Sequence, residues 1–345
     1  MDVVPSEGMK WHHPTLRANA TAFPGSLLLE GMHMTRQRDP AWLAAQYNNR
    51  ARVPGHGEIL ARWAQDSAAV RSAVPCRLDL AYGASPAERL DVFTARQAAD
   101  GRRAGTGVGA ARRKAAPRTQ AAQGAPLMVF IHGGWWRSLD KSDHSFVAPP
   151  FTAAGGVVVV PNYALCPSAS MEEIALQMAR SLAWCWRNAR DLGADPERIS
   201  VAGHSAGGHL AAMMLCALWK RLGDDLPADL VKSALSISGV FELEPIRRTP
   251  FLQADLRLTP QSVRRLSPAG FPAPRGTLRA VAGALESEEF LRHNRLIRRR
   301  WGDRAVPVCE SIAEADHFTV VDGLTRADSR LQDLTLQMLG LDATN

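Results

Sequence analysis

The sequence lacks any long apolar run, although 46% of its 345 residues are hydrophobic. No stretch reaches the roughly 18 uninterrupted apolar residues that a membrane-spanning helix needs, which argues against a membrane protein. The N-terminus, MDVVPSEGMKWHHPTLR, lacks a basic start followed by an apolar run and a small-residue cleavage site, so we predict no secretory signal. The composition is sufficient for one large buried core.

Cysteine is scarce and scattered. The five cysteines are odd in number and none forms a CxxC pair, so neither a disulfide framework nor a zinc site is indicated. Cys216, within the apolar run AAMMLCALW, is expected to be a small buried residue. We therefore expect a reduced, cytoplasmic protein with no metal and no cofactor.

Basic charge is in excess but confined to one segment. The net charge is +7, yet residues 100–124 (DGRRAGTGVGAARRKAAPRTQAAQG) carry five Arg and one Lys against one Asp and so hold +5 of it. This segment lacks aromatic residues and apolar periodicity, so burial cannot offset the entropy of ordering it. We predict a disordered basic insertion at about 97–125, with a polyanion-binding arm as the alternative. Elsewhere the charge gives no reason to expect nucleic acid or membrane as a partner.

The order of apolar segments predicts an α/β fold. Two segments that alternate polar and apolar residues are expected to form a half-solvated antiparallel pair. Six further apolar runs follow, most of them separated by helical patterns, which is typical of a mostly parallel sheet with helices on both faces. We expect an N-terminal helical cap segment at 1–70 and the α/β domain at 71–345. The expected strands are 77–83, 88–95, 127–134, 156–163, 198–205, 233–240, 277–284 and 306–312, and the expected helices include 39–53, 56–73, 171–192, 206–219 and 287–302.

The strongest chemical motif is GHSAG at residues 203–207, between the strand RISVAG and the helix AGGHLAAMM. This placement is typical of a nucleophile elbow, a sharp strand-to-helix turn that exposes a serine. Ser205 is therefore the predicted nucleophile. The amide of Ala206, at the start of the helix, is a predicted oxyanion donor. His204 is expected to pack beside the serine and not to act as the base.

A second motif, HGGWW at residues 132–136, directly follows the strand LMVFI. Glycines at this position let backbone amides approach an acyl oxygen, so Gly133 and Gly134 are predicted to complete an oxyanion hole. We expect Trp135 and Trp136 to offer an aromatic surface to the substrate. A cation from the following loop, RSLDKSDH, would pair with a substrate carboxylate.

The general base and its acid partner are expected after the nucleophile, in the chain order Ser, Asp or Glu, His. Only His293 and His317 follow residue 209, and His293 lies in a helical pattern, so His317 is the predicted base. Glu286, after the strand TLRAVAGAL, is the favoured acid. The alternatives are Glu242, the pair Glu288 and Glu289 at a helix start, and Asp316, which adjoins the histidine.

Taken together, several segments resemble kynurenine formamidase (arylformamidase)-like hydrolases, of the hormone-sensitive-lipase branch of the α/β hydrolases. They are DPAWLAAQYNNRA, HGGWWRSLDKSDHSFVA, PNYALCP, GHSAGGHLAAM, LSP at 266–268, GALESEEFLRHNRL and DHFTVVDGL. The resemblance implies an eight-stranded α/β-hydrolase sheet with a small helical cap, the residues Ser205, Glu286 and His317 as catalytic triad, and hydrolysis of N-formyl-L-kynurenine. Two features depart from the family: the loop usually reads HGGYW, and several members carry Asp at the acid position.

The sequence therefore predicts a serine hydrolase that cleaves a small aryl formamide or carboxylic ester through an acyl-enzyme. The expected partner is a small-molecule substrate, and a homodimer remains open. A general short-chain carboxylesterase is the alternative enzyme. A binding protein that keeps the α/β-hydrolase fold without the chemistry is the alternative of another class.

Overall fold

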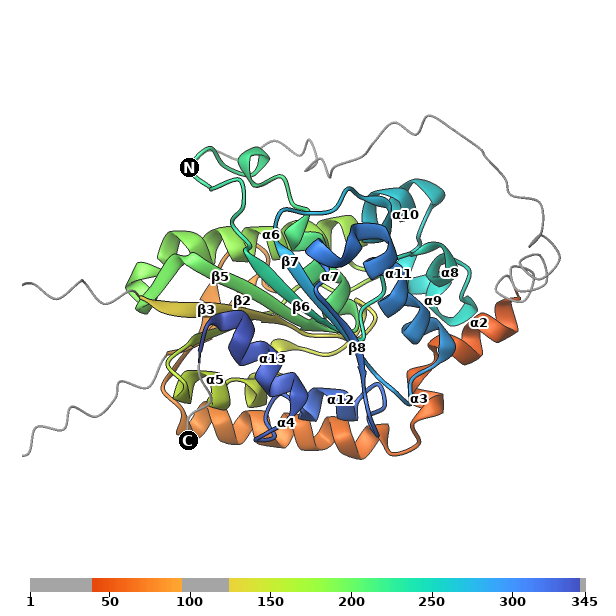
Figure 1. The fold of residues 1–345 in the computed structure, drawn as a ribbon, viewed down its shortest axis with the longest axis horizontal. Coiled ribbons are helices and arrows are strands. Elements are labelled where there is room, and N and C mark those ends of the chain that lie inside the picture. The colour runs from red at the N-terminus through yellow and green to blue at the C-terminus, as the bar shows by residue number, and fades with distance from the viewer. Residues whose placement is uncertain (1–38, 95–123, 342–345) are drawn as a thin grey trace, which may run out of the picture.

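The computed structural model describes residues 39–94 and 124–341, and the predicted insertion lies outside the described residues except for its last two positions. The described chain forms an eight-stranded sheet with helices on both faces (Figure 1). Strand order is β1-β2-β4-β3-β5-β6-β7-β8, and β2 runs antiparallel to both of its neighbours while β4, β3 and β5 to β8 are parallel. The predicted fold class is confirmed.

All eight predicted strands are present. Their bounds are β1 (Cys76–Ala81), β2 (Arg89–Phe93), β3 (Ala125–Ile131), β4 (Val157–Pro161), β5 (Ala194–His204), β6 (Ser233–Ile237), β7 (Thr277–Gly283) and β8 (Val308–Ile312). The structure begins β3 at Ala125, whose amide donates to the Gly193 carbonyl at 3.0 Å, so the predicted insertion extends slightly too far.

The helices fall into three groups. Those on one face of the sheet are α6 (Met171–Asn188), α7 (Ala206–Leu215) and α11 (Glu288–Ala305), and those on the other are α4 (His56–Ala73), α5 (Pro149–Ala153), α12 (Thr319–Asp322) and α13 (Arg330–Leu339). The third group comprises α2 (Pro40–Tyr47), α3 (Asn49–Arg52), α8 (Glu244–Arg247), α9 (Pro250–Leu256) and α10 (Pro260–Leu266). Because α2 contacts α8, α9 and α11, this group lies beside the sheet and not on either face (Figure 1).

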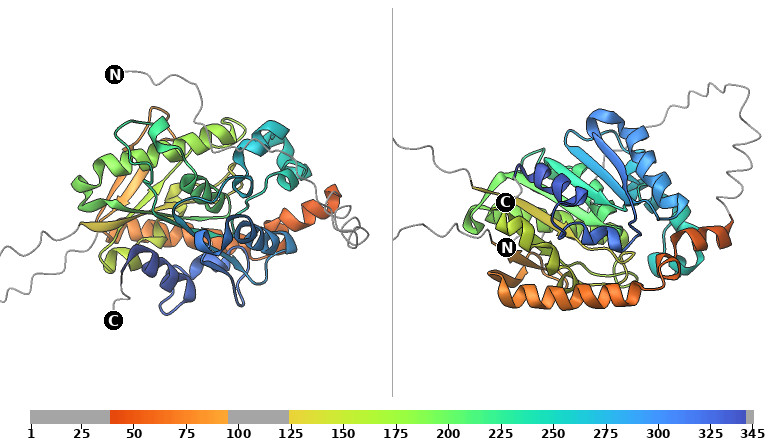
Figure 2. Two further views of the ribbon diagram at one scale, coloured as in Figure 1. Left: turned by 45° about the horizontal axis from the view of Figure 1, so that its top comes forward. Right: turned by 60° about the horizontal axis from the view of Figure 1, so that its bottom comes forward.

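Two apolar clusters form the core, one on each side of the sheet. Along β3, Leu127, Val129 and Ile131 belong to one cluster, whereas Met128 and Phe130 belong to the other. All five side chains are fully buried, as expected for a parallel strand covered on both faces. The second cluster includes Trp63, through which α4 packs along its face of the sheet (Figure 2). Helix α4 is thus part of a sheet-covering layer, although the sequence analysis assigned it to the cap segment.

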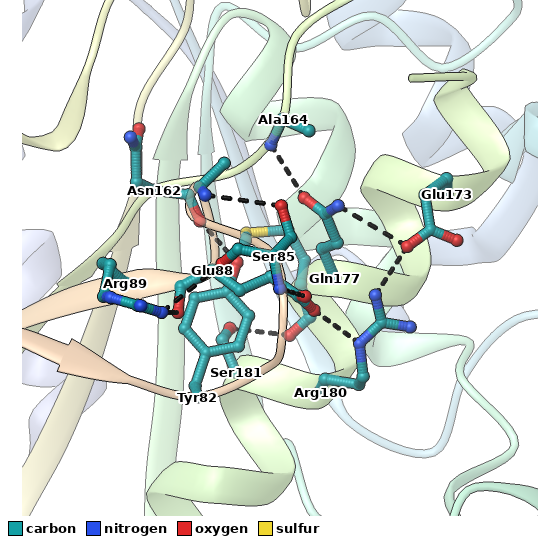
Figure 3. A network of polar contacts seen from close by, with 12 residues as sticks. Tyr82, Ser85, Glu88, Arg89, Asn162, Ala164, Glu173, Gln177, Arg180 and Ser181 are labelled. Carbon is teal, nitrogen blue, oxygen red and sulfur yellow. Dashed lines mark hydrogen bonds and ion pairs between the residues drawn. The ribbon is translucent and has the colours of Figure 1, made fainter. Parts of the chain in front are cut away.

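A network of polar contacts fastens the β1–β2 hairpin to the rest of the fold (Figure 3). Buried Glu88 accepts from the Arg180 guanidinium of α6 at 2.6 Å, and Tyr82 donates to the Asn162 carbonyl at 2.5 Å. On the same helix, Gln177 accepts from the Ala164 amide at 2.7 Å. The network therefore ties the edge of the sheet to α6 and to the loop that follows β4.

The predicted half-solvated character of the hairpin is wrong for β2. Asp91, which the alternating pattern placed toward water, is fully buried. Its carboxylate accepts from the Lys141 ammonium at 2.7 Å and from the Asp79 amide at 2.9 Å. Burial lowers the pKa of Lys141, but hydrogen bonds to Asp79 and Asp91 outweigh burial and raise it overall, so the lysine remains charged. A cation from a loop 50 residues later in the sequence makes this burial tolerable.

Replacing this lysine should destabilise the fold strongly. Lys141→Met leaves Asp91 buried without its cation, and we expect a loss of about 3–5 kcal/mol in the free energy of unfolding. Urea unfolding measures the loss. Lys232→Met is the matched control, because Lys232 is 35% exposed in its pairs with Asp229 and Glu197 and should cost about 1 kcal/mol or less. Equal losses in the two variants would contradict the assignment.

Candidate active site

Ser205 occupies a sharp turn between β5 and α7. Its φ of +57° lies in the left-handed region, which a residue with a side chain rarely adopts. The turn depends on its flanking glycines, because a Cβ on Gly203 would overlap the Gly207 carbonyl and a Cβ on Gly207 would overlap the Ile131 carbonyl. The turn therefore holds the serine at the carboxyl edge of the sheet, at the N-terminus of α7.

A continuous hydrogen-bonded relay leads away from this serine. His317 Nε2 lies 3.1 Å from Ser205 Oγ, and His317 Nδ1 lies 2.7 Å from Glu286 Oε2. The other carboxylate oxygen, Oε1, accepts from Ser238 Oγ at 2.5 Å and from the Gly283 amide at 2.6 Å. All three relay residues are buried. The structure thus brings together the serine, histidine and glutamate that the sequence analysis selected, in the geometry that nucleophilic catalysis requires.

The alternative acids are engaged elsewhere. Glu242 is 40% exposed and pairs with Arg292 at 2.9 Å. Glu288 begins α11, where its charge complements the helix dipole. Asp316 accepts from the amides of Phe318 and of the residue after it, at 2.8 and 2.9 Å, and so fixes the start of α12. Glu289, which also begins α11, accepts from the Tyr47 hydroxyl at 2.5 Å.

The HGG loop lies against the nucleophile. A Cβ added to Gly133 would come within 3.2 Å of Ser205 Cβ, and Gly134 adopts a φ of +101°. His132 holds this loop: its Nδ1 lies 2.8 Å from the Gly133 carbonyl oxygen, and its Nε2 lies 3.2 Å from Asn162 Oδ1. Tyr163 stacks on the His132 ring at 4.2 Å and donates to its carbonyl at 2.9 Å. This role of Tyr163 could not be predicted from the sequence, since nothing in PNYALCP marks a residue that supports the HGG loop.

A cavity of about 490 Å³ opens beside Ser205 and His317. Trp135 lines it, but Trp136 does not: this indole is fully buried and packs edge-on against His209 at 5.0 Å. The prediction that Trp136 contacts the substrate is therefore wrong, because a neighbouring position in the sequence does not imply the same environment. A larger cavity, of about 610 Å³, lies at the C-terminal end of α7 and contains none of the predicted site residues.

Charged and polar side chains line the wall of the 490 Å³ cavity away from the sheet. From the loop expected to supply a cation, Arg137 lines the cavity and pairs with Asp255 of α9, whereas Lys141 is committed to Asp91. The N-terminal segment adds residues that the sequence analysis did not select. They are Asn48, Asn49 and Arg50.

Four histidines near the site are kept neutral by burial. His204 Nε2 lies 2.8 Å from the His317 carbonyl, so this nitrogen donates and His204 holds the His317 backbone, which fits its expected packing role. Burial, and next the neighbouring His317, hold the pKa of His204 well below its usual range. Burial is also the main cause that lowers the pKa of each of three others to about 4. These are His132, His144 and His209.

The fold and the family comparison define the class of protein. A family profile described as "alpha/beta hydrolase fold" matches residues 128–275. A proposed thioesterase from Silicibacter sp. superposes with a TM-score of 0.69, at 24% identity over 86% of this chain and 98% of that chain. The thermophilic carboxylesterase EstE1 superposes with a TM-score of 0.59, at 19% identity over 82% of this chain and 94% of that chain. The chain is an enzyme, a hydrolase with the α/β-hydrolase fold.

Within this class the chain is similar to kynurenine formamidases. It is 26% identical to the enzyme of Danio rerio over 78% of this chain and 84% of the relative, and 27% identical to that of Salmo salar over 76% and 82%. A carboxylesterase of Mycobacterium tuberculosis is 38% identical, but over 26% of this chain and 28% of its own length. The predicted resemblance to an arylformamidase-like hydrolase of the esterase branch is confirmed.

The contacts of the carboxylates rank them as partners of His317. Glu286→Gln removes the charge that faces Nδ1, and we expect kcat to fall by a factor of about a hundred or more. Glu242→Gln, the matched control, breaks only a half-exposed ion pair and should leave kcat within about threefold. Steady-state kinetics on an activated ester measures both. A larger loss in the Glu242 variant would move the acid to the end of the preceding strand.

The buried histidines predict acid sensitivity. Their folded pKa of about 4 lies below the ordinary 6.5, so the unfolded chain binds more protons between these values and stability falls as pH drops through this window. Each of the three histidines should lower the free energy of unfolding by about 2 kcal/mol at pH 5. Urea unfolding at pH 7 and pH 5 measures the loss. His209→Gln, which retains a donor for the Leu266 carbonyl, should reduce it, and equal stability at both pH values would contradict the prediction.

Proposed function

We propose that this protein hydrolyses a small aryl formamide or carboxylic ester, of the N-formylkynurenine type, through an acyl-enzyme on Ser205. One observation carries the proposal: Ser205 Oγ, His317 and Glu286 form a hydrogen-bonded relay, at 3.1 and 2.7 Å, that opens on a cavity. The similarity to kynurenine formamidases over more than four-fifths of those relatives supports the formamide as substrate.

In the proposed mechanism, Ser205 Oγ attacks the substrate carbonyl carbon while His317 Nε2 takes the hydroxyl proton. Glu286 stabilises the imidazolium that forms, because its Oε2 faces Nδ1. The amides of Gly133, Gly134 and Ala206 are proposed to bind the developing oxyanion. The protonated His317 then gives its proton to the leaving amine or alcohol. Water attacks the acyl-enzyme with His317 again as base, which releases the acid.

Of the two predicted tryptophans, Trp135 is the one placed to offer an aromatic surface to the leaving group. It lines the cavity, and Tyr47 supports it edge-on at 5.8 Å. An aryl leaving group stacked on this indole would gain about 0.5–1.5 kcal/mol beyond the burial of its area. This preference distinguishes the formamidase from the second candidate, a general short-chain carboxylesterase, which the similarity to a mycobacterial carboxylesterase favours.

The setting of the enzyme is also a proposal. All five cysteines are free thiols, and three of them are buried, which supports a reduced, cytoplasmic location. Among residues 39–94 and 124–341, no helix has the length and apolar character to cross a membrane.

A side-by-side substrate series tests the proposal. We expect kcat/KM to be greatest for N-formyl-L-kynurenine and to fall steeply as p-nitrophenyl esters lengthen from formate to butyrate. Trp135→Ala should weaken the preference for aromatic leaving groups, and Trp136→Ala, once shown to be folded, is the matched control. Ser205→Ala should lower turnover by about a thousandfold or more.

Two outcomes would overturn the assignment. If butyrate or hexanoate esters are the best substrates and N-formylkynurenine is untouched, the enzyme is a carboxylesterase. If a fluorophosphonate does not label Ser205 and no acyl substrate is turned over, the chain is a binding protein that keeps the fold.

A further inference from the structure

Two cavities meet the catalytic histidine from different sides. The larger, of about 490 Å³, is lined by Ser205 and His317, and a smaller one, of about 250 Å³, is lined by Glu286 and His317. Besides His317, only Asn49 lines both within the described ranges 39–94 and 124–341. This asparagine therefore stands beside the base, on a wall that the HGG loop does not form.

The carboxamide nitrogen of Asn49 is buried without a partner among the described residues. The residue is 5% exposed, and its Nδ2 has no hydrogen bond to any other described residue. A buried donor left unpaired is costly, so a polar side chain persists there at the expense of stability unless something else accepts from it. Asparagine χ2 is a soft torsion with broad minima, so the carboxamide can reorient when a ligand enters.

The segment that carries Asn49 is held rigidly. Two residues earlier, fully buried Tyr47 donates to Glu289 of α11 at 2.5 Å. The preceding residue, Asn48, caps α3 by accepting from the Ala51 amide at 3.1 Å. Asn49 is thus the first residue of a helix whose N-terminal side is held in place, so its backbone position is set before a ligand enters the cavity.

The position of Asn49 selects the part of the substrate that it meets. In the proposed function, the acyl oxygen faces the amides of Gly133, Gly134 and Ala206. The leaving group departs on the side of His317, which must protonate it. Because Asn49 lies on that same side, the part of the substrate that it meets is the leaving group and not the acyl group.

We propose that Asn49 determines specificity by donating a hydrogen bond from Nδ2 to a carbonyl oxygen on the leaving group, adjacent to the scissile bond. This inference rests on the proposed function and narrows its substrate class to acyl compounds whose leaving group bears such an acceptor. A site that offers a buried donor rejects an analogue without the acceptor, because the donor then stays unpaired.

A matched pair of substrates tests this inference. 2-Acetylformanilide carries the carbonyl next to the formamide, and 2-ethylformanilide has nearly the same shape without it. Their reactivities differ, so the enzymatic ratio of kcat/KM is compared with the ratio for hydroxide-catalysed hydrolysis. We expect the kcat/KM ratio of the wild-type enzyme, 2-acetylformanilide over 2-ethylformanilide, to exceed the corresponding ratio for hydroxide, here called the chemical ratio, by about tenfold or more. A wild-type ratio equal to the chemical ratio would overturn the inference without any variant.

Variants locate the effect. In Asn49→Ala and in Asn49→Leu, which keeps a branched side chain but has no donor, the excess should disappear while kcat/KM for 2-ethylformanilide changes by less than about threefold. Asn188→Ala is the control, because its amide donates to the Trp184 carbonyl at 2.8 Å at the end of α6. An equal loss on both substrates in a folded Asn49 variant assigns the residue to water activation or to structure, and overturns the inference. A different result would refute the proposed function itself: the wild type hydrolyses neither formanilide, and fluorophosphonate does not label Ser205.

Discussion

The relay from Glu286 through His317 to Ser205 places one demand on the whole fold, because its members come from three separate strand ends. Ser205 follows β5, Glu286 follows β7 and His317 follows β8. Hydrogen bonds of 2.7 and 3.1 Å tolerate little displacement, so these strand ends must keep a fixed register. The parallel pairing of β5 to β8 through β6 and β7 provides it, and the two apolar clusters clamp the sheet from both faces.

The hydrogen bonds to Glu286 show how the register of the strands orients a side chain of the site. Ser238, just beyond β6, and the amide of Gly283, at the end of β7, both donate to the same carboxylate oxygen. Ser238 itself adopts a φ of +54°, which turns its hydroxyl away from a regular strand extension. A carboxylate held by two donors on one oxygen leaves the other free to face His317. The ends of the adjacent strands β6 and β7 thus orient the Glu286 carboxylate as well as position it.

Much of this arrangement could be predicted from local sequence patterns. The eight strands are short apolar runs, and the turn at Ser205 has a five-residue signature whose glycines have a steric reason. Glu286 could be favoured because the fold requires an acid after β7. Each of these features is determined by one short segment, together with the order Ser, Asp or Glu, His along the chain.

What could not be predicted depends on contacts between distant segments. Asp91 reads as a solvent-facing residue of an alternating strand until Lys141 is seen to neutralise it. Trp135 and Trp136 are equivalent in the sequence, yet one lines the cavity and the other is fully buried against His209. Asn49 lies in a segment noted only for its resemblance to a family, and the packing of this segment beside His317 is what reveals its place at the site.

The same long-range packing explains how an N-terminal segment becomes part of the site. The Phe241 amide donates to His293 Nδ1 at 3.2 Å, and burial, then the neighbouring Arg292, holds the pKa of His293 well below its usual range. The neutral ring therefore carries its proton on Nε2, which donates to the Tyr47 hydroxyl at 3.0 Å, and this hydroxyl donates to Glu289. Arg292 neutralises that carboxylate at 2.7 Å. Only one arrangement of protons satisfies every group in this series of hydrogen bonds, so α2 is fixed against α11. Helix α11 also carries Phe290, whose ring lies 4.5 Å from that of His317. The wall of the cavity and His317 consequently share one rigid support.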